Sequence, residues 1–152
     1  MAKNFTIPAF CFAALALTAP ALLAKKVVLK DLQPAVQKAI EAEAKGAEIK
    51  NISSETENRV AQYEVETMLS GKHRDFNVDT TGKLLELEEE TTLDALPAAA
   101  KAAIVKKAAG GTVGTVERAT KGSQTTYEAV YTSKDGKKHE VVVDEAGVQT
   151  KH

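Results

Sequence analysis

The stretch YEVETMLSGKHRDFNVDTTG, residues 63–82, has a close counterpart later in the chain, YEAVYTSKDGKKHEVVVDEAG, residues 127–147. In both copies, apolar and polar residues alternate along two runs, which is typical of strands with one buried face. A turn pair separates the runs, Ser70-Gly71 in the first copy and Asp135-Gly136 in the second. Each copy therefore predicts two antiparallel strands joined by a tight turn.

Both copies then end in the pattern Asp-x-x-Gly. We expect Asp79 or Asp144 to cap a type I turn with its carboxylate, and the glycine that follows to adopt a positive φ. The letters H-R-D at residues 73–75 resemble a kinase catalytic loop, but the second copy keeps the turns and lacks these letters. A kinase also needs a Gly-rich loop and a D-F-G, which the chain lacks. The pattern predicts a structural hairpin.

A helix is predicted ahead of each pair of strands, because apolar residues recur there at helical spacing. Asp31 and Asp94 are the expected N-caps, and Gly46 and Gly110 the expected ends of the two helices. The apolar positions are Leu32, Val36, Ala39, Ile40 and Ala44 in the first helix and Leu96, Ala100, Ala103, Ile104 and Ala108 in the second. Each set forms one stripe that a sheet can cover.

The matched positions indicate an internal duplication, since Leu32 corresponds to Leu96, Tyr63 to Tyr127 and Gly82 to Gly147. The expected fold is α+β, with two tandem repeats. In each repeat one helix packs on one face of a three- to four-stranded antiparallel sheet. The pattern leaves open whether the two sheets are continuous. The stretch Thr91–Asp94 is too short for a free linker, which favours close association.

Three segments are expected: a signal peptide at 1–24, a first repeat at 25–90 and a second at 91–152. One lysine precedes an apolar run that ends in small residues, and cleavage fits after Ala24 or Ala21. Two prolines interrupt the run, which argues against stable membrane insertion. We therefore expect export to the bacterial periplasm or secretion, with an uncleaved signal anchor as the alternative.

Composition excludes several classes of function for the mature chain. The signal segment removes one of the 20 basic residues and none of the 21 acidic ones, which leaves a net charge of about −2. That charge excludes a basic footprint for nucleic acid. The one cysteine, Cys11, leaves with the signal, so neither a disulfide nor thiol chemistry is expected.

The sequence offers no constellation for catalysis or metal binding. The histidines are His73, His139 and His152, and none has a nucleophile or an orienting partner in the pattern. We predict a protein that is not an enzyme, with no catalytic residue, metal or cofactor. The run Glu88-Glu89-Glu90 is compatible with binding of cations or basic peptides, but a solvated last strand is favoured.

One helix covers only one face of a sheet, so the other face is available to water or to a partner. Strand parity gives this face a polar and mainly acidic character. The candidate partner-binding residues on it are Glu64, Glu66, Met68, Asp75, Glu128, Val130 and Glu140. A surface of this kind favours a partner held weakly or by charge.

The helix sequences LQPAVQKAI and LPAAAKAAI, each followed by the tyrosine strand and the V-D-x-x-G hairpin, resemble a tandem of PepSY-like domains of the β-lactamase-inhibitor-protein-like fold. The resemblance covers nearly all of residues 28–151. It implies small α+β units in secreted or periplasmic bacterial proteins, including propeptides of some peptidases. The implied role is non-enzymatic: holding a protein, inhibiting a hydrolase or sensing a component of the envelope.

We therefore expect an exported binding module that inhibits or chaperones a secreted or periplasmic hydrolase of the peptidase kind. The expected partner is an extracytoplasmic protein, and the expected state is a monomer. The alternative is an envelope sensor that binds cations or basic peptides on the acidic sheet face.

Overall fold

The computed structural model describes residues 25–57 and 59–150. The predicted signal peptide, its cleavage sites, Cys11 and His152 lie outside this part of the chain. The helices are η1 (Leu29–Asp31), α1 (Pro34–Ala44), η2 (Leu93–Ala95) and α2 (Ala98–Ala108). The strands are β1 (Lys25–Lys26), β2 (Glu48–Glu57), β3 (Val60–Leu69), β4 (Lys72–Asp79), β5 (Leu84–Thr91), β6 (Thr112–Lys121), β7 (Gln124–Thr132) and β8 (Lys138–Asp144).

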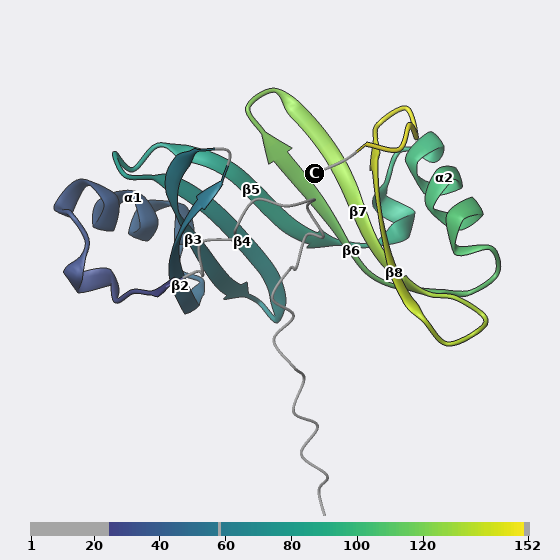
Figure 1. Cartoon of the computed structure of the whole chain (residues 1–152), viewed down its shortest axis with the longest axis horizontal. Coiled ribbons are helices and arrows are strands. Elements are labelled where there is room, and N and C mark those ends of the chain that lie inside the picture. Colours follow the sequence, from purple (N-terminus) through teal and green to yellow (C-terminus); the bar gives the residue numbers. More distant parts are fainter. Residues whose placement is uncertain (1–24, 58, 151–152) are drawn as a thin grey trace, which may run out of the picture.

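The strands form one antiparallel sheet in the order of the chain, from β1 to β8. Figure 1 shows α1 and α2 at opposite ends of the long axis, with the strands between them. The predicted α+β class and antiparallel pairing are confirmed. The sheet is larger than expected, because β5 pairs with β6 from Glu86 opposite Lys121 to Thr91 opposite Val116. The two predicted sheets are therefore one continuous sheet.

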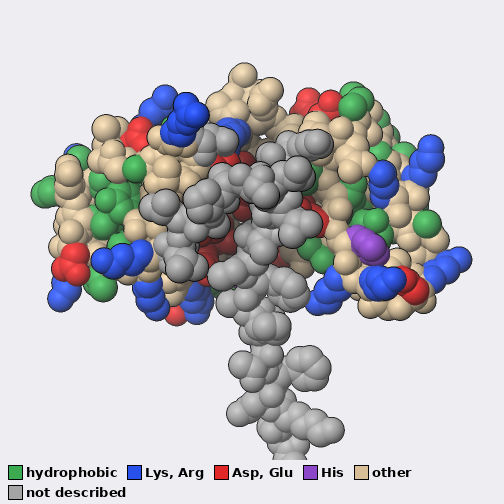
Figure 2. Space-filling view, viewed as in Figure 1, with side chains coloured by type: hydrophobic (Ala, Val, Ile, Leu, Met, Phe, Trp, Pro, Cys, Tyr) green, Lys and Arg blue, Asp and Glu red, His purple; other side chains and the backbone are tan. Residues whose placement is uncertain are grey.

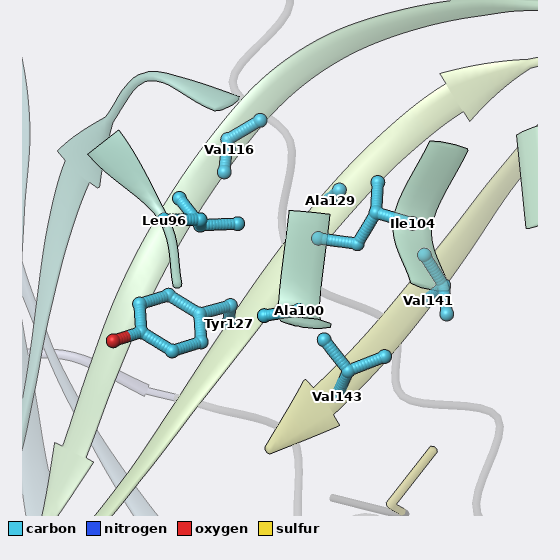
Figure 3. Close-up of a cluster of buried hydrophobic side chains, with 8 residues drawn as sticks. All are labelled: Leu96, Ala100, Ile104, Val116, Tyr127, Ala129, Val141 and Val143. Carbon is cyan, nitrogen blue, oxygen red and sulfur yellow. The ribbon is translucent and has the colours of Figure 1, made fainter. Parts of the chain in front are cut away.

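Each helix packs its apolar stripe on its own part of the sheet. From α1, Val36, Ile40 and Ala44 are buried against Ile52, Val65, Phe76 and Val78. The corresponding cluster around α2 is drawn in Figure 3 and consists of Leu96, Ala100, Ile104, Val116, Tyr127, Ala129, Val141 and Val143. The predicted stripes are confirmed. Three of the five stripe alanines, Ala44, Ala100 and Ala108, are buried.

The predicted N-caps are wrong. Asp31 and Asp94 lie in η1 and η2, and each helix begins three or four residues later, at Pro34 and Ala98. A capping side chain must come from the residue directly before the first turn, and that residue makes no side-chain cap in either helix. Asp94 instead accepts a hydrogen bond from Lys101 Nζ at 2.6 Å.

The predicted turns are confirmed. Ser70 and Gly71 have φ values of 54° and 81° and form the two-residue turn between β3 and β4. Asp79 Oδ1 accepts hydrogen bonds from the backbone N–H groups of Thr81 at 2.8 Å and Lys83 at 3.0 Å. Gly82 has a φ of 88° and lies directly under α1. The turn thus seats the hairpin against the helix.

Candidate binding face

The face of the sheet that turns away from α1 and α2 is called the open face below. Cross-strand partners share a face, and neighbours along a strand alternate between faces. Because Val65, Phe76, Ala129 and Val141 belong to the helix-side cores, the residues beside them point the other way. All seven predicted site residues therefore lie on the open face: Glu64, Glu66 and Met68 on β3, Asp75 on β4, Glu128 and Val130 on β7 and Glu140 on β8.

The central strands add acidic residues that the predicted site does not contain. Glu88 lies opposite Asp75, and Glu90 lies opposite Glu117. Glu117 in turn lies opposite Glu128, so three adjacent strands bring glutamates side by side. We call Glu90, Glu117 and Glu128 the carboxylate row.

The run Glu88-Glu89-Glu90 lies, as expected, in the last strand of the first repeat, but its residues are less solvated than predicted. These residues are half-buried, and their strand β5 is central in the sheet, with partners on both sides. The sequence contains one indication that this strand packs on the core. Leu87 is the one apolar residue among the acidic ones, and it packs against the core of the first half.

Like charges directly opposite one another across strands destabilise each other, and the carboxylate row shows the consequence. Burial, followed by the charges of Glu128, Asp75 and Glu90, raises the pKa of Glu117 to about 7. Glu140 contributes in the same direction. The row therefore carries a carboxyl that titrates close to neutral pH.

Burial also raises the pKa values of Glu64 and Asp75, although both carboxylates accept hydrogen bonds that act in the opposite direction. Ser53 Oγ donates to Glu64 at 3.0 Å. The backbone N–H of Thr67 donates to Asp75 Oδ1 at 2.7 Å, where the pairing of β3 with β4 is interrupted. Asp75 thus lies on the open face and also links β3 to β4 where their backbone pairing is interrupted.

The arginines of the central strands lie on the opposite, helix side. Arg74 is buried and donates to the backbone oxygen of Glu43 on α1 at 2.6 Å. Its Nε lies 3.5 Å from Glu89, which also pairs with Arg118 on β6. The hydrogen bond from Arg118 lowers the pKa of Glu89. This arrangement separates charge across the sheet, with arginine on one side and the carboxylate row on the other.

The charge distribution is visible on the surface. Figure 2 shows acidic side chains in the middle of the molecule and lysine and arginine side chains mainly toward its edges. On the open face, Lys121 donates a 3.0 Å hydrogen bond to Glu86 and lies 3.7 Å from Glu57. These contacts hold that lysine at the β5–β6 end of the face.

The histidines lie apart from one another. His73 Nδ1 is 3.8 Å from Asp75 Oδ2 on the open face. His139 is exposed and stacks on Tyr131 with a ring-centroid distance of 5.2 Å. Across residues 25–57 and 59–150, no group of three or more His, Cys, Asp and Glu side chains is arranged to hold a metal ion. Within the same residues, no helix has the length and apolarity to span a membrane.

Residues 97–144 match the PepSY family model, described as peptidase propeptide and YPEB domain. The matched segment runs from the start of α2 to the end of β8 and contains the second V-D-x-x-G hairpin up to its aspartate. No curated protein matches the chain.

Solved structures from Bacteroides share the fold. A proposed periplasmic protein from Bacteroides eggerthii superposes with a TM-score of 0.63 at 16% identity, covering 79% of this chain and 86% of that one. A DUF2874 family protein from Bacteroides ovatus gives 0.60 at 14%, covering 79% and 85%. A BLIP-like protein from Bacteroides fragilis gives 0.56 at 20%, covering 78% and 83%. The family match in the second half of the chain and the shared fold confirm the predicted resemblance to PepSY-like domains.

Proposed function

We propose that the chain is an exported, non-enzymatic binding module built from two PepSY-like repeats, residues 25–90 and 91–152, behind a signal peptide at 1–24. The proposal is supported by the PepSY match in the second half and by the repeated order of one α-helix followed by antiparallel strands. The periplasmic description of the Bacteroides eggerthii protein supports an extracytoplasmic location.

The observation that carries the proposal is the acidic open face. Strands β3 to β8 all place carboxylates on it, while Arg74 and Arg118 are held on the helix side by Glu43 and Glu89. A surface of one sign attracts a partner of the other sign, accelerates encounter and repels wrong partners. The partner is therefore an extracytoplasmic protein that presents a lysine- or arginine-rich surface, bound by a monomer of this chain.

A hydrolase of the peptidase kind is the class of partner that the comparisons favour. The family match is to a domain described as a peptidase propeptide, and one structural neighbour is described as BLIP-like. A module that covers a basic rim around a hydrolase active site would inhibit the enzyme or assist its folding without chemistry of its own.

An envelope sensor on the same face is the second candidate. The carboxylate row favours it. Burial and acidic neighbours raise the pKa of Glu117, and a cation that approaches the row stabilises the ionised form of this carboxyl. Among the described residues, no three or more His, Cys, Asp or Glu side chains are arranged to hold a metal ion. Basic peptides are therefore a better ligand for such a sensor than metal ions.

The test is a pull-down with residues 25–152 as bait, from the periplasmic and secreted fractions of the host. A second bait carries Glu66→Gln and Glu140→Gln on the open face. The matched control carries Glu41→Gln and Glu145→Gln, which are exposed and lie on α1 and in the turn after β8. We expect a basic hydrolase that the first and control baits retain and the open-face variant loses.

Retention of the same protein by all three baits would contradict the assignment of the open face. The captured hydrolase is then assayed with and without the module. Reduced turnover makes the module an inhibitor, whereas a higher refolding yield makes it a chaperone.

A further inference from the structure

The carboxylate row places three like charges side by side where the two halves of the sheet join. Glu90, Glu117 and Glu128 occupy adjacent positions on β5, β6 and β7, directly opposite one another in the register. Neighbouring strands lie about 4.8 Å apart, so each charge has a like charge within the distance at which two carboxyls cannot both ionise freely.

The surroundings of Glu117 add to this repulsion. From β4 it faces Asp75 and, beyond it, His73, and from β5 it faces Glu90, with Glu88 on the same face. From β7 it faces Glu128. From β8 it faces Glu140, and Lys138 stands on the same face opposite Thr132. Acidic groups thus surround Glu117 from the two nearest strands on each side, β4 and β5 on one and β7 and β8 on the other.

We propose that the carboxylate row is a proton-linked switch: in mild acid it holds a proton that a docking basic segment displaces, so acid weakens partner binding and stabilises the free chain. The binding half of this proposal rests on the function proposed above, whereas the stability half does not. The switch would let the module hold its partner at neutral pH and release it on acidification.

The direction of the effect follows from linkage. Glu117 has a pKa near 7 in the folded chain and the ordinary value of 4.5 when unfolded. The folded chain therefore binds more protons between these values, and its stability increases as the pH falls through 7 toward 4.5. That stability is lost again as the pH rises through 7. A lysine or arginine placed on the row favours the ionised form, so its binding expels the proton and weakens as the pH falls.

The first experiment follows thermal unfolding of residues 25–152 at pH 5.5 and pH 7.5. We expect the midpoint to be several degrees higher at pH 5.5. Glu117→Gln should raise the midpoint at pH 7.5 and remove most of the pH difference, while Glu41→Gln on α1 should leave that difference unchanged. If Glu117→Gln fails to fold, Glu90→Gln and a ¹³C NMR titration of the Glu117 carboxyl in the wild-type chain take its place.

The second experiment measures binding of an octalysine peptide at both pH values by calorimetry. We expect binding to be severalfold weaker at pH 5.5 for the wild-type chain and nearly independent of pH for Glu117→Gln. A stability shift without any peptide binding overturns the binding half together with the proposed function. Peptide binding that is equal at both pH values, with no stability shift, overturns the switch and leaves the proposed function standing.

Discussion

Gly147 meets two steric demands in the turn after β8. Its φ of 78° lies in the left-handed region, and a Cβ built on it would lie 2.6 Å from the backbone oxygen of Ala99 on α2. Gly82 meets the same two demands under α1, where the corresponding distance to Ala35 O is 2.9 Å. Backbone atoms cannot move away as a flexible side chain can, so these positions accept only glycine.

Gly147→Ala should therefore cost considerably more stability than an ordinary glycine substitution. Gly122→Ala is the matched control, because Gly122 also has a positive φ but its Cβ would meet nothing within 4 Å. We expect a loss of about 1 kcal/mol for the control and at least about 2 kcal/mol more for Gly147→Ala, measured by urea unfolding. Equal losses for the two variants would show that the close approach to α2 has no energetic weight.

The residues at these turns could be predicted from the sequence because their chemistry is local. Asp79 reaches backbone groups two and four residues further on, and the positive φ of the glycine belongs to the turn itself. The helix starts could not be predicted in the same way. Asp31 has the right side chain for a cap, but η1 occupies the position at which the cap was expected.

At the scale of elements, Arg74 joins α1, β4 and β5. Its side chain is only 5% exposed and lies within ion-pair distance of Glu43 and Glu89. Removing one member of a buried ion pair leaves the others uncompensated in a poorly solvated site. Arg118 pairs with the same Glu89 from β6, but half of its side chain is exposed.

Arg74→Ala should accordingly destabilise the chain by about 3–5 kcal/mol. Arg118→Ala, at the exposed end of the same network, should cost about 1 kcal/mol or less. Chemical denaturation of both variants gives the comparison. If Arg118→Ala proved the more costly change, the buried pair on α1 would not be what secures the helix to β4.

The side of the sheet on which Glu117 lies could not be predicted, for a physical reason. A bulge between Val113 and Val116 interrupts the pairing of β6 with β7, and another between Ile49 and Asn51 interrupts that of β2 with β3. Each bulge inserts residues that break the two-residue period. Parity therefore cannot be carried from one end of β6 to the other, although it places the seven predicted residues correctly on their regular strands.

At the scale of the whole molecule, the decisive contact is the pairing of β5 with β6. It turns two small sheets into one and creates the carboxylate row across the junction. The short stretch Thr91–Asp94 indicated that the two repeats are closely associated. The pairing of β5 with β6 could not be predicted, because the register between strands far apart in the chain does not follow from a local sequence pattern. Of the row, Glu128 was therefore among the predicted site residues, whereas Glu90 and Glu117 were not.

Because β5 covers the edge of β6, the second half should not be an independent unit. A fragment of residues 91–152 exposes that edge and has a core of only about 60 residues behind it. We expect residues 25–152 to unfold in one cooperative transition, and the fragment to be much less stable or to self-associate. Chemical denaturation and analytical ultracentrifugation measure both properties. A monomeric fragment as stable as the full chain would disprove the coupling of the halves.

The central claim is that the open face of the sheet receives a basic partner. The most direct test is an NMR titration of ¹⁵N-labelled residues 25–152 with the octalysine peptide at pH 7.5. We predict that shifts will concentrate at open-face positions of the central strands, with Glu66, Glu117 and Glu140 among them, and that added salt will reverse them. Shifts confined to α1 and α2, or none at any peptide concentration, would contradict the claim.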